Sequence, residues 1–253
     1  MSLQGEDSSL TPVPEFRVRL PALLLAATLL SGCTGALDGL DPERGQQPIP
    51  ASLVKHIEAK GMTTTAPVLI RIFKTENVLE LWKEKPSGEY ALLKSYEICK
   101  FSGHLGPKFK EGDRQAPEGF YEVNRHLLNP NSRYYLSINM GFPNAYDRAH
   151  GRTGSYLMVH GDCMSIGCYA MTDAKIEEIY GLVEAALAAG QPFVRVHVFP
   201  FRMTAENVAR HGGSPWADFW TNLKEGYDSF EQAGHPPNVT VRDLRYHFEP
   251  TET

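Results

Sequence analysis

The chain has 253 residues, a formal net charge of −5 and a hydrophobic content of 42 %, enough for a sizeable core in one large domain or two small ones. The mild acidity argues against nucleic acid as a partner, because nucleic-acid binding requires clustered basic charge. The sequence also contains no internal repeat and no phosphate-binding loop.

The N-terminus predicts a lipoprotein signal peptide over residues 1–33. Arg17 and Arg19 precede the apolar run LPALLLAATLL at 20–30, which is too short to span a membrane. The Ser-Gly-Cys that follows ends at Cys33 and resembles a bacterial lipobox, in which the cysteine is lipidated. The alternative is the ordinary cleavage site of a soluble secreted protein.

A lipid on Cys33 would anchor the protein to a membrane on the periplasmic side of the cell envelope. Thr34 stands where an aspartate would favour inner-membrane retention, so the outer membrane is favoured. This compartment is oxidising. Cys99, Cys163 and Cys168 remain after lipidation, and because their number is odd, at least one thiol stays free or pairs outside the chain.

Residues 34–66 are expected to form a tether followed by a short helix at 52–60. A catalytic region is then expected over 67–199, with a C-terminal extension packed on it over 200–253. Strands are predicted from apolar and β-branched runs at 68–74, 77–84, 89–101, 120–127, 133–140, 156–160, 192–199 and 239–248.

Two amphipathic helices are predicted in the C-terminal part. The first begins after the cap residue Thr172 and ends near Gly190. Most strands precede His160 and most helices follow it, which predicts the α+β class. The second helix begins at Ser214-Pro215, and its buried stripe is expected to contain Trp216, Phe219, Trp220, Leu223, Tyr227 and Phe230.

The stretch MVHGDCMSIGCYAMTD at 158–173 combines one histidine with two cysteines. His160, Cys163 and Cys168 could bind a metal, but a structural zinc site normally has four ligands and no second pair is present. Cys163 and Cys168 could form a local disulfide. Alternatively, His160 could activate Cys168 as a nucleophile, with backbone N–H groups of the glycine-rich turn binding an oxyanion.

His160-Gly161 followed by the run SIGC at 165–168 resembles the catalytic signature of the L,D-transpeptidase (YkuD) family. Residues 142–173 are most similar to the YafK-like branch of that family, and QAPEGFYEV at 115–123 resembles an upstream family element. The resemblance implies an L,D-transpeptidase-type β-rich core with helices mainly in its C-terminal part. It also implies that no metal and no organic cofactor is needed.

The resemblance implies a catalytic role for three residues. Cys168 would be the nucleophile and His160 its base, and the carbonyl of Gly161 would orient the imidazole. Cys163 is expected to be a bystander thiol or a redox partner of Cys168, and Cys99 a small buried hydrophobe. The loop that forms the oxyanion site would include Ser165, Gly167 and Tyr169.

The sequence departs from the family pattern at the substrate side. Typical members place histidine and cysteine farther apart and carry arginine two residues after the cysteine, where this chain has Ala170. Arg148 and Arg152 could supply a substitute charge for a substrate carboxylate, with Tyr146 beside them. The alternative for both arginines is a solvated loop.

Family members act on peptidoglycan stem peptides at diaminopimelate through a thioester. The YafK-like branch includes an enzyme that frees an outer-membrane lipoprotein from the wall. The missing arginine and the branch motif therefore favour hydrolysis over transpeptidation, which would form cross-links or attachments. A non-catalytic wall-binding lipoprotein is the other alternative. A disulfide-exchange protein is disfavoured because it would need a CxxC motif.

Overall fold

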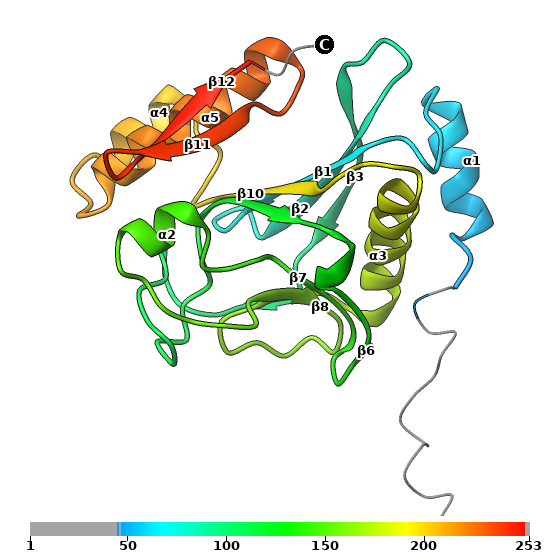
Figure 1. Cartoon of the computed structure of the whole chain (residues 1–253), viewed down its shortest axis with the longest axis horizontal. Coiled ribbons are helices and arrows are strands. Elements are labelled where there is room, and N and C mark those ends of the chain that lie inside the picture. The colour runs from blue at the N-terminus through cyan, green and yellow to red at the C-terminus, as the bar shows by residue number, and fades with distance from the viewer. Residues whose placement is uncertain (1–44, 46, 251–253) are drawn as a thin grey trace, which may run out of the picture. The chain divides into compact units, whose positions relative to one another are not determined.

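The computed structural model describes residue 45 and residues 47–250, so the signal peptide, Cys33 and most of the tether lie outside the described residues. The described chain is an α+β protein with two five-stranded sheets and a two-stranded hairpin. Figure 1 shows β1, β2 and β10 of the first sheet above β7 and β8 of the second, with α3 at one side of both. Among these residues no helix is long and apolar enough to cross a membrane.

The first sheet has the strand order β3-β2-β1-β10-β5. At its centre β1 and β10 run parallel, and all other neighbours are antiparallel. Every residue of β1 is buried, as expected for a central strand, including Arg71 among five apolar residues. The strands are β1 (Val68–Phe73), β2 (Val78–Glu84), β3 (Tyr90–Glu97), β5 (Gly119–Val123) and β10 (Val194–Phe199).

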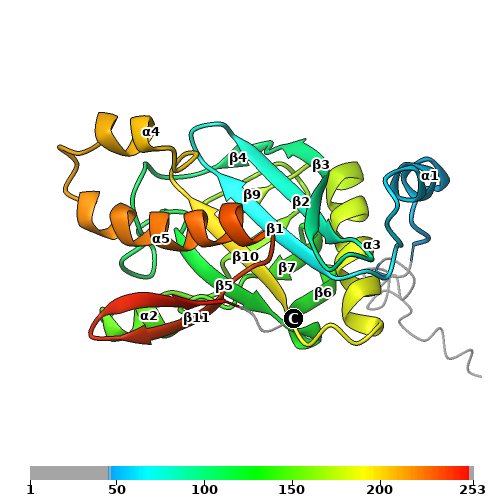
Figure 2. The same cartoon turned by 90° about the horizontal axis from the view of Figure 1, so that it is seen from above.

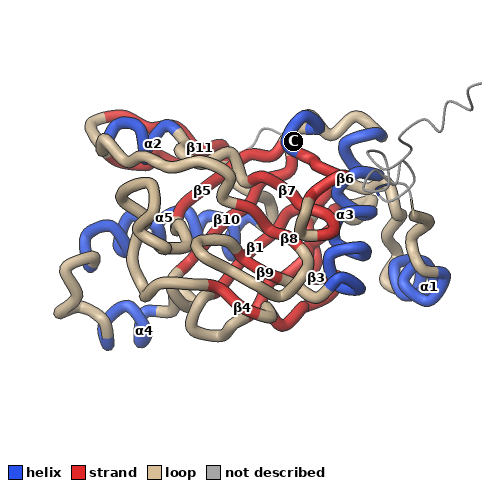
Figure 3. The backbone as a smooth tube through the Cα atoms, turned by 90° about the horizontal axis from the view of Figure 1, so that it is seen from below, coloured by secondary structure: helices blue, strands red, loops and turns tan. Residues whose placement is uncertain are grey.

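The second sheet has the order β4-β9-β8-β7-β6 and carries the motif stretch. Here β8 and β9 are the parallel pair, and the remaining neighbours are antiparallel. Figure 3 shows β8 and β9 side by side near the centre of this face. The strands are β4 (Lys100–Phe101), β6 (Leu128–Ser132), β7 (Tyr135–Asn139), β8 (Met158–His160) and β9 (Tyr169–Ala170).

The main core lies between the two sheets and α3. Side chains of strand β10 point alternately to its two faces: Val196 and Val198 enter this core, and Phe199 enters a second cluster.

The remaining elements are helices and a hairpin. They are α1 (Ala51–Ala59), the 3₁₀ helix η2 (Arg125–Leu127), α2 (Ala145–Ala149), α3 (Asp173–Ala188), α4 (Ala205–Arg210), α5 (Ala217–Ala233), β11 (Asn238–Arg242) and β12 (Arg245–Glu249).

The second cluster covers the outer face of the first sheet with the C-terminal segment. Figure 2 shows α5 running across this sheet, with the β11–β12 hairpin beside it. Phe73 and Phe199 from the sheet pack in one cluster with Phe219, Trp220 and Leu223 of α5. The aromatic stripe predicted for this helix is therefore buried against the sheet, with Trp216 and Tyr227 at its partly buried margin.

Four predicted elements differ from the structure. The strand predicted at 120–127 ends at Val123, and residues 125–127 form the 3₁₀ helix η2. The strand predicted at 239–248 is a hairpin, because Asp243 and Leu244 adopt positive φ and reverse the chain. The strand predicted at 89–101 is broken into β3 and β4. The second helix begins two residues later than predicted, with Trp216 in place of Ser214 as its N-cap. The short elements β6, β9, α2 and α4 were not predicted, because each is too short to show a period.

Candidate active site

The ends of β8 and β9 position the histidine and the cysteine of the motif. His160 is the last residue of β8 and is opposite Ala170 of β9, while Cys168 immediately precedes β9. Paired residues on neighbouring strands share a face of the sheet, and residues two apart on one strand also share a face. His160 and Cys168 are therefore placed on the same face, opposite to the core-facing Val159 and Tyr169.

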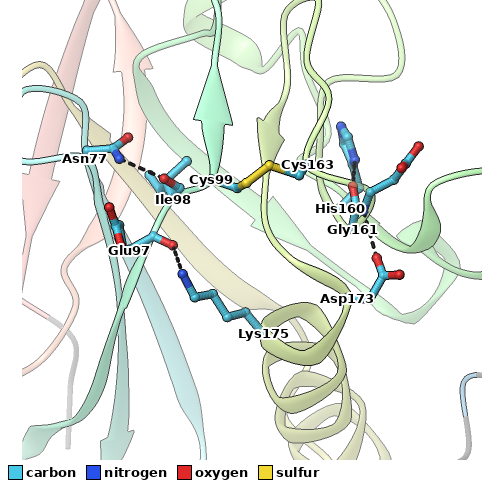
Figure 4. The surroundings of a disulfide bond; sticks show 10 residues. Asn77, Glu97, Ile98, Cys99, His160, Gly161, Cys163, Asp173 and Lys175 are labelled. Atoms are coloured by element: carbon cyan, nitrogen blue, oxygen red, sulfur yellow. Dashed lines mark hydrogen bonds between the residues drawn. A yellow bond between two sulfur atoms is a disulfide. The ribbon is translucent and has the colours of Figure 1, made fainter.

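The imidazole of His160 is fixed by its own chain. Its Nδ1 lies 2.6 Å from the carbonyl oxygen of Gly161, and its ring lies 4.5 Å from the ring of Tyr134, measured between centroids. Figure 4 shows this hydrogen bond. The contact leaves Nε2 as the nitrogen available for proton transfer. Because His160 is only 1 % exposed, burial lowers its pKa, an effect that the Gly161 carbonyl and Asp162 oppose.

Position 161 requires glycine because neighbouring atoms leave no room for a Cβ. A Cβ at this position would lie 2.5 Å from Oδ1 of Asp173 and 2.9 Å from the carbonyl oxygen of Tyr134. The same Asp173 carboxylate accepts a hydrogen bond from the N–H of Asp162, which ties the turn to the start of α3. The carbonyl that holds His160 is thus fixed by the turn, by β7 and by the helix.

Cys168 is 8 % exposed, and its thiol lies 3.5 Å from the carbonyl oxygen of Tyr156, to which it donates. Burial raises the pKa of this thiol, while a backbone hydrogen bond from Met158 and the charge of Lys108 lower it. The resting thiol and imidazole are therefore both favoured in their neutral forms. This arrangement suits proton transfer to His160 at the moment of attack better than a permanent thiolate.

Lys108 is a buried cation at this site that the sequence analysis missed. Its ammonium group is held by Asp113 at 2.5 Å and by the Lys110 carbonyl at 2.9 Å. Residues 154–156 lie between Lys108 and Cys168: a Cβ on Gly154 would lie 2.6 Å from Cε of Lys108, and the Tyr156 carbonyl accepts from the Cys168 thiol. Lys108 lies between predicted strands, and no local sequence pattern marks it.

Ser165 organises the turn before Cys168. Its hydroxyl accepts hydrogen bonds from the N–H groups of Gly167, at 3.2 Å, and Cys168, at 3.0 Å, and donates to the carbonyl of Cys168 at 2.7 Å. Gly167 has φ +142°, which favours glycine. The two N–H groups expected to bind an oxyanion thus have an internal acceptor. Tyr169 instead points into the core, where its hydroxyl donates to the Pro117 carbonyl at 2.8 Å.

The three predicted substrate-binding residues lie in and just after α2. Tyr146 is buried and stacks between the rings of His150 and Tyr246. Arg152 is also buried, and its guanidinium forms an ion pair with Asp147 at 2.8 Å. Arg148 is exposed and lines a cavity beside the C-terminal hairpin. In this structure only Arg148 offers its charge to a ligand.

The second cysteine of the motif is engaged with Cys99. The two form a disulfide with a Cα–Cα distance of 5.4 Å across 64 positions of sequence (Figure 4). The predictions for Cys163, as a bystander or redox partner of Cys168, and for Cys99, as a buried hydrophobe, were therefore wrong. Sequence spacing would not reveal the pair, because pairing of β4 with β9 brings Cys99 to the Ala170 carbonyl. Cys168 remains the free cysteine among the described residues.

The described residues contain no group of three or more histidine, cysteine or acidic side chains arranged to hold a metal ion. The site that they do contain has a free thiol and a neutral imidazole fixed by a backbone carbonyl, on the same face of a mixed sheet. Such a site is suited to acyl transfer through a thioester.

Comparison with known proteins identifies the class. The family model YkuD, described as the L,D-transpeptidase catalytic domain, matches residues 71–198, and the chain belongs to this family. The chain is 51 % identical over 223 residues to YafK of Escherichia coli strain K12, named as a candidate L,D-transpeptidase, with 88 % of each chain covered. The YafK sequence of E. coli O157:H7 matches to the same extent.

Two solved structures resemble the chain at lower similarity. The helical cell shape determining protein Pgp2 from Campylobacter jejuni is 18 % identical with a TM-score of 0.43, covering 76 % of this chain and 80 % of that one. Bd1075 of Bdellovibrio bacteriovorus is 14 % identical with a TM-score of 0.40, covering 71 % of this chain and 78 % of that one.

Proposed function

We propose that this peptidoglycan-modifying enzyme is a cysteine hydrolase that cleaves at diaminopimelate of stem peptides and releases wall-bound lipoprotein. Family membership supports an enzyme of the L,D-transpeptidase class with stem peptides as substrate. The observation that carries the mechanism is the hydrogen bond from Nδ1 of His160 to the Gly161 carbonyl, because it leaves Nε2 as the nitrogen available to exchange a proton with Cys168 on the same face of the sheet.

The proposed reaction has two halves. In the first, the sulfur of Cys168 attacks the carbonyl carbon at the L-centre of diaminopimelate while His160 takes the thiol proton. The tetrahedral intermediate then expels the amine, which receives that proton from the imidazolium, and a thioester remains. In the second half, water adds to the thioester with His160 as base, and the released thiol recovers its proton.

The position of Ala170 supports hydrolysis over transpeptidation. Typical family members carry an arginine here, whereas Ala170 is fully buried between Lys100 of β4 and His160 of β8. The nearby charge comes instead from Lys108, which Asp113 neutralises. With less positive charge to hold a second peptide, water is the favoured acceptor. Transpeptidation, which forms cross-links or attachments, is the second candidate, supported by the family match.

We also propose a location on the periplasmic side of the envelope, with a lipid on Cys33 in the outer membrane. The lipobox-like sequence LSGC at 30–33 supports this location. A lipid tether would hold the catalytic region near the wall and raise its effective concentration there. Labelling with a radioactive fatty acid would test it: wild type should incorporate label and Cys33→Ala should not.

The activity is tested with residues 34–253 and with the variants Cys168→Ala and His160→Gln. Each is incubated with sacculi that carry covalently bound lipoprotein and with free disaccharide-tetrapeptides, and products are read by mass spectrometry. We expect released lipoprotein or trimmed stems from wild type and none from either variant. Diaminopimelate–diaminopimelate cross-links would establish transpeptidation instead. Equal products from wild type and Cys168→Ala would refute the cysteine mechanism.

A non-catalytic lipoprotein predicts an unreactive Cys168. Because Cys163 is bonded to Cys99, it does not block Cys168 through a disulfide in this structure. Iodoacetamide labelling of the native protein, followed by peptide mapping, separates the two functions. Selective labelling of Cys168 is expected for the enzyme, and an absence of labelling would favour the binding protein.

A further inference from the structure

Unpaired donors gather on the outer face of the first sheet. Arg195 and His197 are two positions apart on β10, and His197 is opposite Arg71 of β1, so the three side chains share one face. They supply five of the seven buried side-chain nitrogen and oxygen atoms that have no hydrogen-bond partner among the described residues. Buried polar groups are nearly always paired, so such a concentration needs an explanation.

Arg71 is accounted for by its surroundings. Its guanidinium forms an ion pair with Glu231 at 2.7 Å and lies against aromatic rings of the sheet and α5, the nearest being Tyr227 and Phe230 at 4.6 Å. The guanidinium of Arg195 likewise lies over an aromatic ring, at 4.9 Å from the centroid of Phe193, but this contact does not pair its Nε. The ring of His197 meets that of Phe120 edge to face at 4.8 Å, which leaves its two nitrogens without a hydrogen bond within the described part of the chain. The Nε of Arg195 and both ring nitrogens of His197 are buried without a partner among the described residues, and His197 is only 1 % exposed.

These two residues line a cavity of about 280 Å³ at the boundary between the catalytic sheet and the C-terminal hairpin. Strands β5 and β10 form one wall, α2 a second and the β11–β12 hairpin a third. Neither His160 nor Cys168 lines it, so the cavity is separate from the catalytic pair. The lining that bears on a ligand comprises Arg148, Arg195, His197, Phe120, Val239 and Val241.

The charges around the cavity favour an anion. Arg148 and Arg195 are the cations in its wall, and the one acid among its described lining residues, Glu122, is opposite Arg195 on β5, so the two arginines leave an excess of positive charge. One nitrogen of the Arg148 guanidinium donates to the Pro143 carbonyl, and its other donors remain for a ligand. Arg195 is positioned by Asn238, whose side-chain oxygen accepts from Nη2 at 2.7 Å, which leaves Nε for another partner. Burial and the neighbouring Arg71 and Arg195 lower the pKa of His197, so its ring is neutral and offers one N–H donor. The polar groups of Asn144 and Tyr246 already bond one another at 2.9 Å.

We propose that this cavity binds a small carboxylate whose oxygens are held by Arg148, Arg195 and His197. A carboxylate matches the planar fork of a guanidinium and can accept from an imidazole N–H at the same time. Phe120, Val239 and Val241 would surround a short aliphatic body. Two sources present this chemistry: a free dicarboxylate, and a carboxylate of a peptidoglycan stem peptide.

The test measures binding in the Cys168→Ala protein, so that neither turnover nor the proposed function affects the result. Glutarate is titrated by calorimetry, beside its uncharged analogue glutaramide and inorganic phosphate. We expect saturable binding of glutarate alone. Arg148→Gln should weaken it roughly tenfold, while Arg125→Gln, an equally exposed arginine outside the cavity, should leave it unchanged. No saturation, or equal binding of phosphate and glutarate, would overturn the proposal.

A second variant tests the buried donor. His197→Phe removes both unpartnered nitrogens but keeps a ring beside Phe120, so the fold should be retained and its melting temperature should not fall. Glutarate binding should be lost; unchanged binding in this folded variant would contradict the assignment. Competition by a disaccharide-tetrapeptide then distinguishes the sources: displacement of glutarate indicates a stem-peptide carboxylate, and no displacement a free carboxylate.

Discussion

At the scale of single residues, Lys108 partly opposes the effect of burial on the Cys168 thiol. The thiol of Cys168 is buried with few polar partners, and Lys108 supplies the cation that lowers its pKa. Asp113 binds this ammonium at 2.5 Å, and backbone N–H groups hold Asp113 in place. The ion pair of Lys108 and Asp113, which lies outside the motif in the sequence, thus affects the pKa of Cys168.

Replacing Lys108 with Met should therefore raise the pKa of Cys168 and slow its alkylation at neutral pH. Methionine keeps the unbranched stem in the pocket, so the change is mainly the loss of charge. The measurement is the rate of iodoacetamide labelling of Cys168 as a function of pH. The pH at which this rate rises should be higher in Lys108→Met than in wild type. Lys110→Met removes an exposed charge two residues away and is the control. Identical profiles for wild type and Lys108→Met would show that this charge does not reach the thiol.

Gly161 is the residue whose replacement should affect the site most directly. In Gly161→Ala the new Cβ meets Asp173 and the Tyr134 carbonyl, so the turn must move and the carbonyl that holds His160 moves with it. We expect a loss of about 1–3 kcal/mol in unfolding free energy together with a fall in kcat. Gly213→Ala, with nothing within 4 Å of its added Cβ, should be neutral in urea unfolding and turnover assays. If Gly161→Ala is fully active, the position of this turn does not affect catalysis.

At the scale of elements, the disulfide fixes the turn after His160 to the edge strand β4. The N–H of Cys163 donates to the Met171 carbonyl and that of Cys99 to the Ala170 carbonyl, so both cysteines are anchored to β9 or the residue after it. The turn itself contains Asp162 and Cys163 at positive φ, where most residues are strained. The covalent link therefore holds a conformation that local sequence does not favour.

Removing this bond should cost stability chiefly through the unfolded chain. Closing a loop of 64 positions corresponds to about 4 kcal/mol in the chain-entropy model. Cys99→Ser/Cys163→Ser should lose stability of that order in urea unfolding, and reduced wild type should behave like the variant. If the variant unfolds at the same urea concentration as oxidised wild type, the bond does not form in solution.

Elements could be predicted from the sequence where their pattern of apolar residues was long enough to show a period. The apolar pattern of β1, the alternation of β10 and the 3.6-residue period of α3 were predictable. The roles of His160, Gly161 and Cys168 came from the family resemblance and stay predictions, because spacing alone left a metal site and a local disulfide open. The β11–β12 hairpin was not predictable, because its turn residues Asp243 and Leu244 include no glycine or asparagine. Lys108 and the Cys99–Cys163 pair depend on contacts between distant segments, which no local pattern records.

At the scale of the whole molecule, a buried ion pair joins the sheet to both flanking parts of the chain. Lys74 and Glu118 are fully buried and lie 2.9 Å apart. Lys74 also donates to three loop carbonyls between His104 and Ala116, and Glu118 accepts from the N–H of Gly106 and from the indole of Trp220 in α5. The catalytic loop region and the C-terminal extension thus depend on one polar centre.

Lys74→Met should lower the unfolding free energy by about 3–5 kcal/mol, because Glu118 is left as an uncompensated buried charge. Adding Glu118→Gln should recover part of this loss, since the lone charge is then removed. Arg210→Met breaks an exposed pair with Glu206 and should change stability by less than about 1 kcal/mol. Urea unfolding of the four proteins checks the series, and a double variant less stable than Lys74→Met would contradict it.

The placement of the cysteines also determines how the enzyme matures. In an unfolded chain Cys163 meets Cys168, five positions away, far more often than Cys99, because short loops close at lower entropic cost. Oxidation before folding therefore joins Cys168 to Cys163 in a non-native bond. Oxidation after β4 has paired with β9 joins Cys99 to Cys163 and leaves Cys168 reduced. The yield of correctly bonded protein is thus set by the relative rates of strand pairing and thiol oxidation.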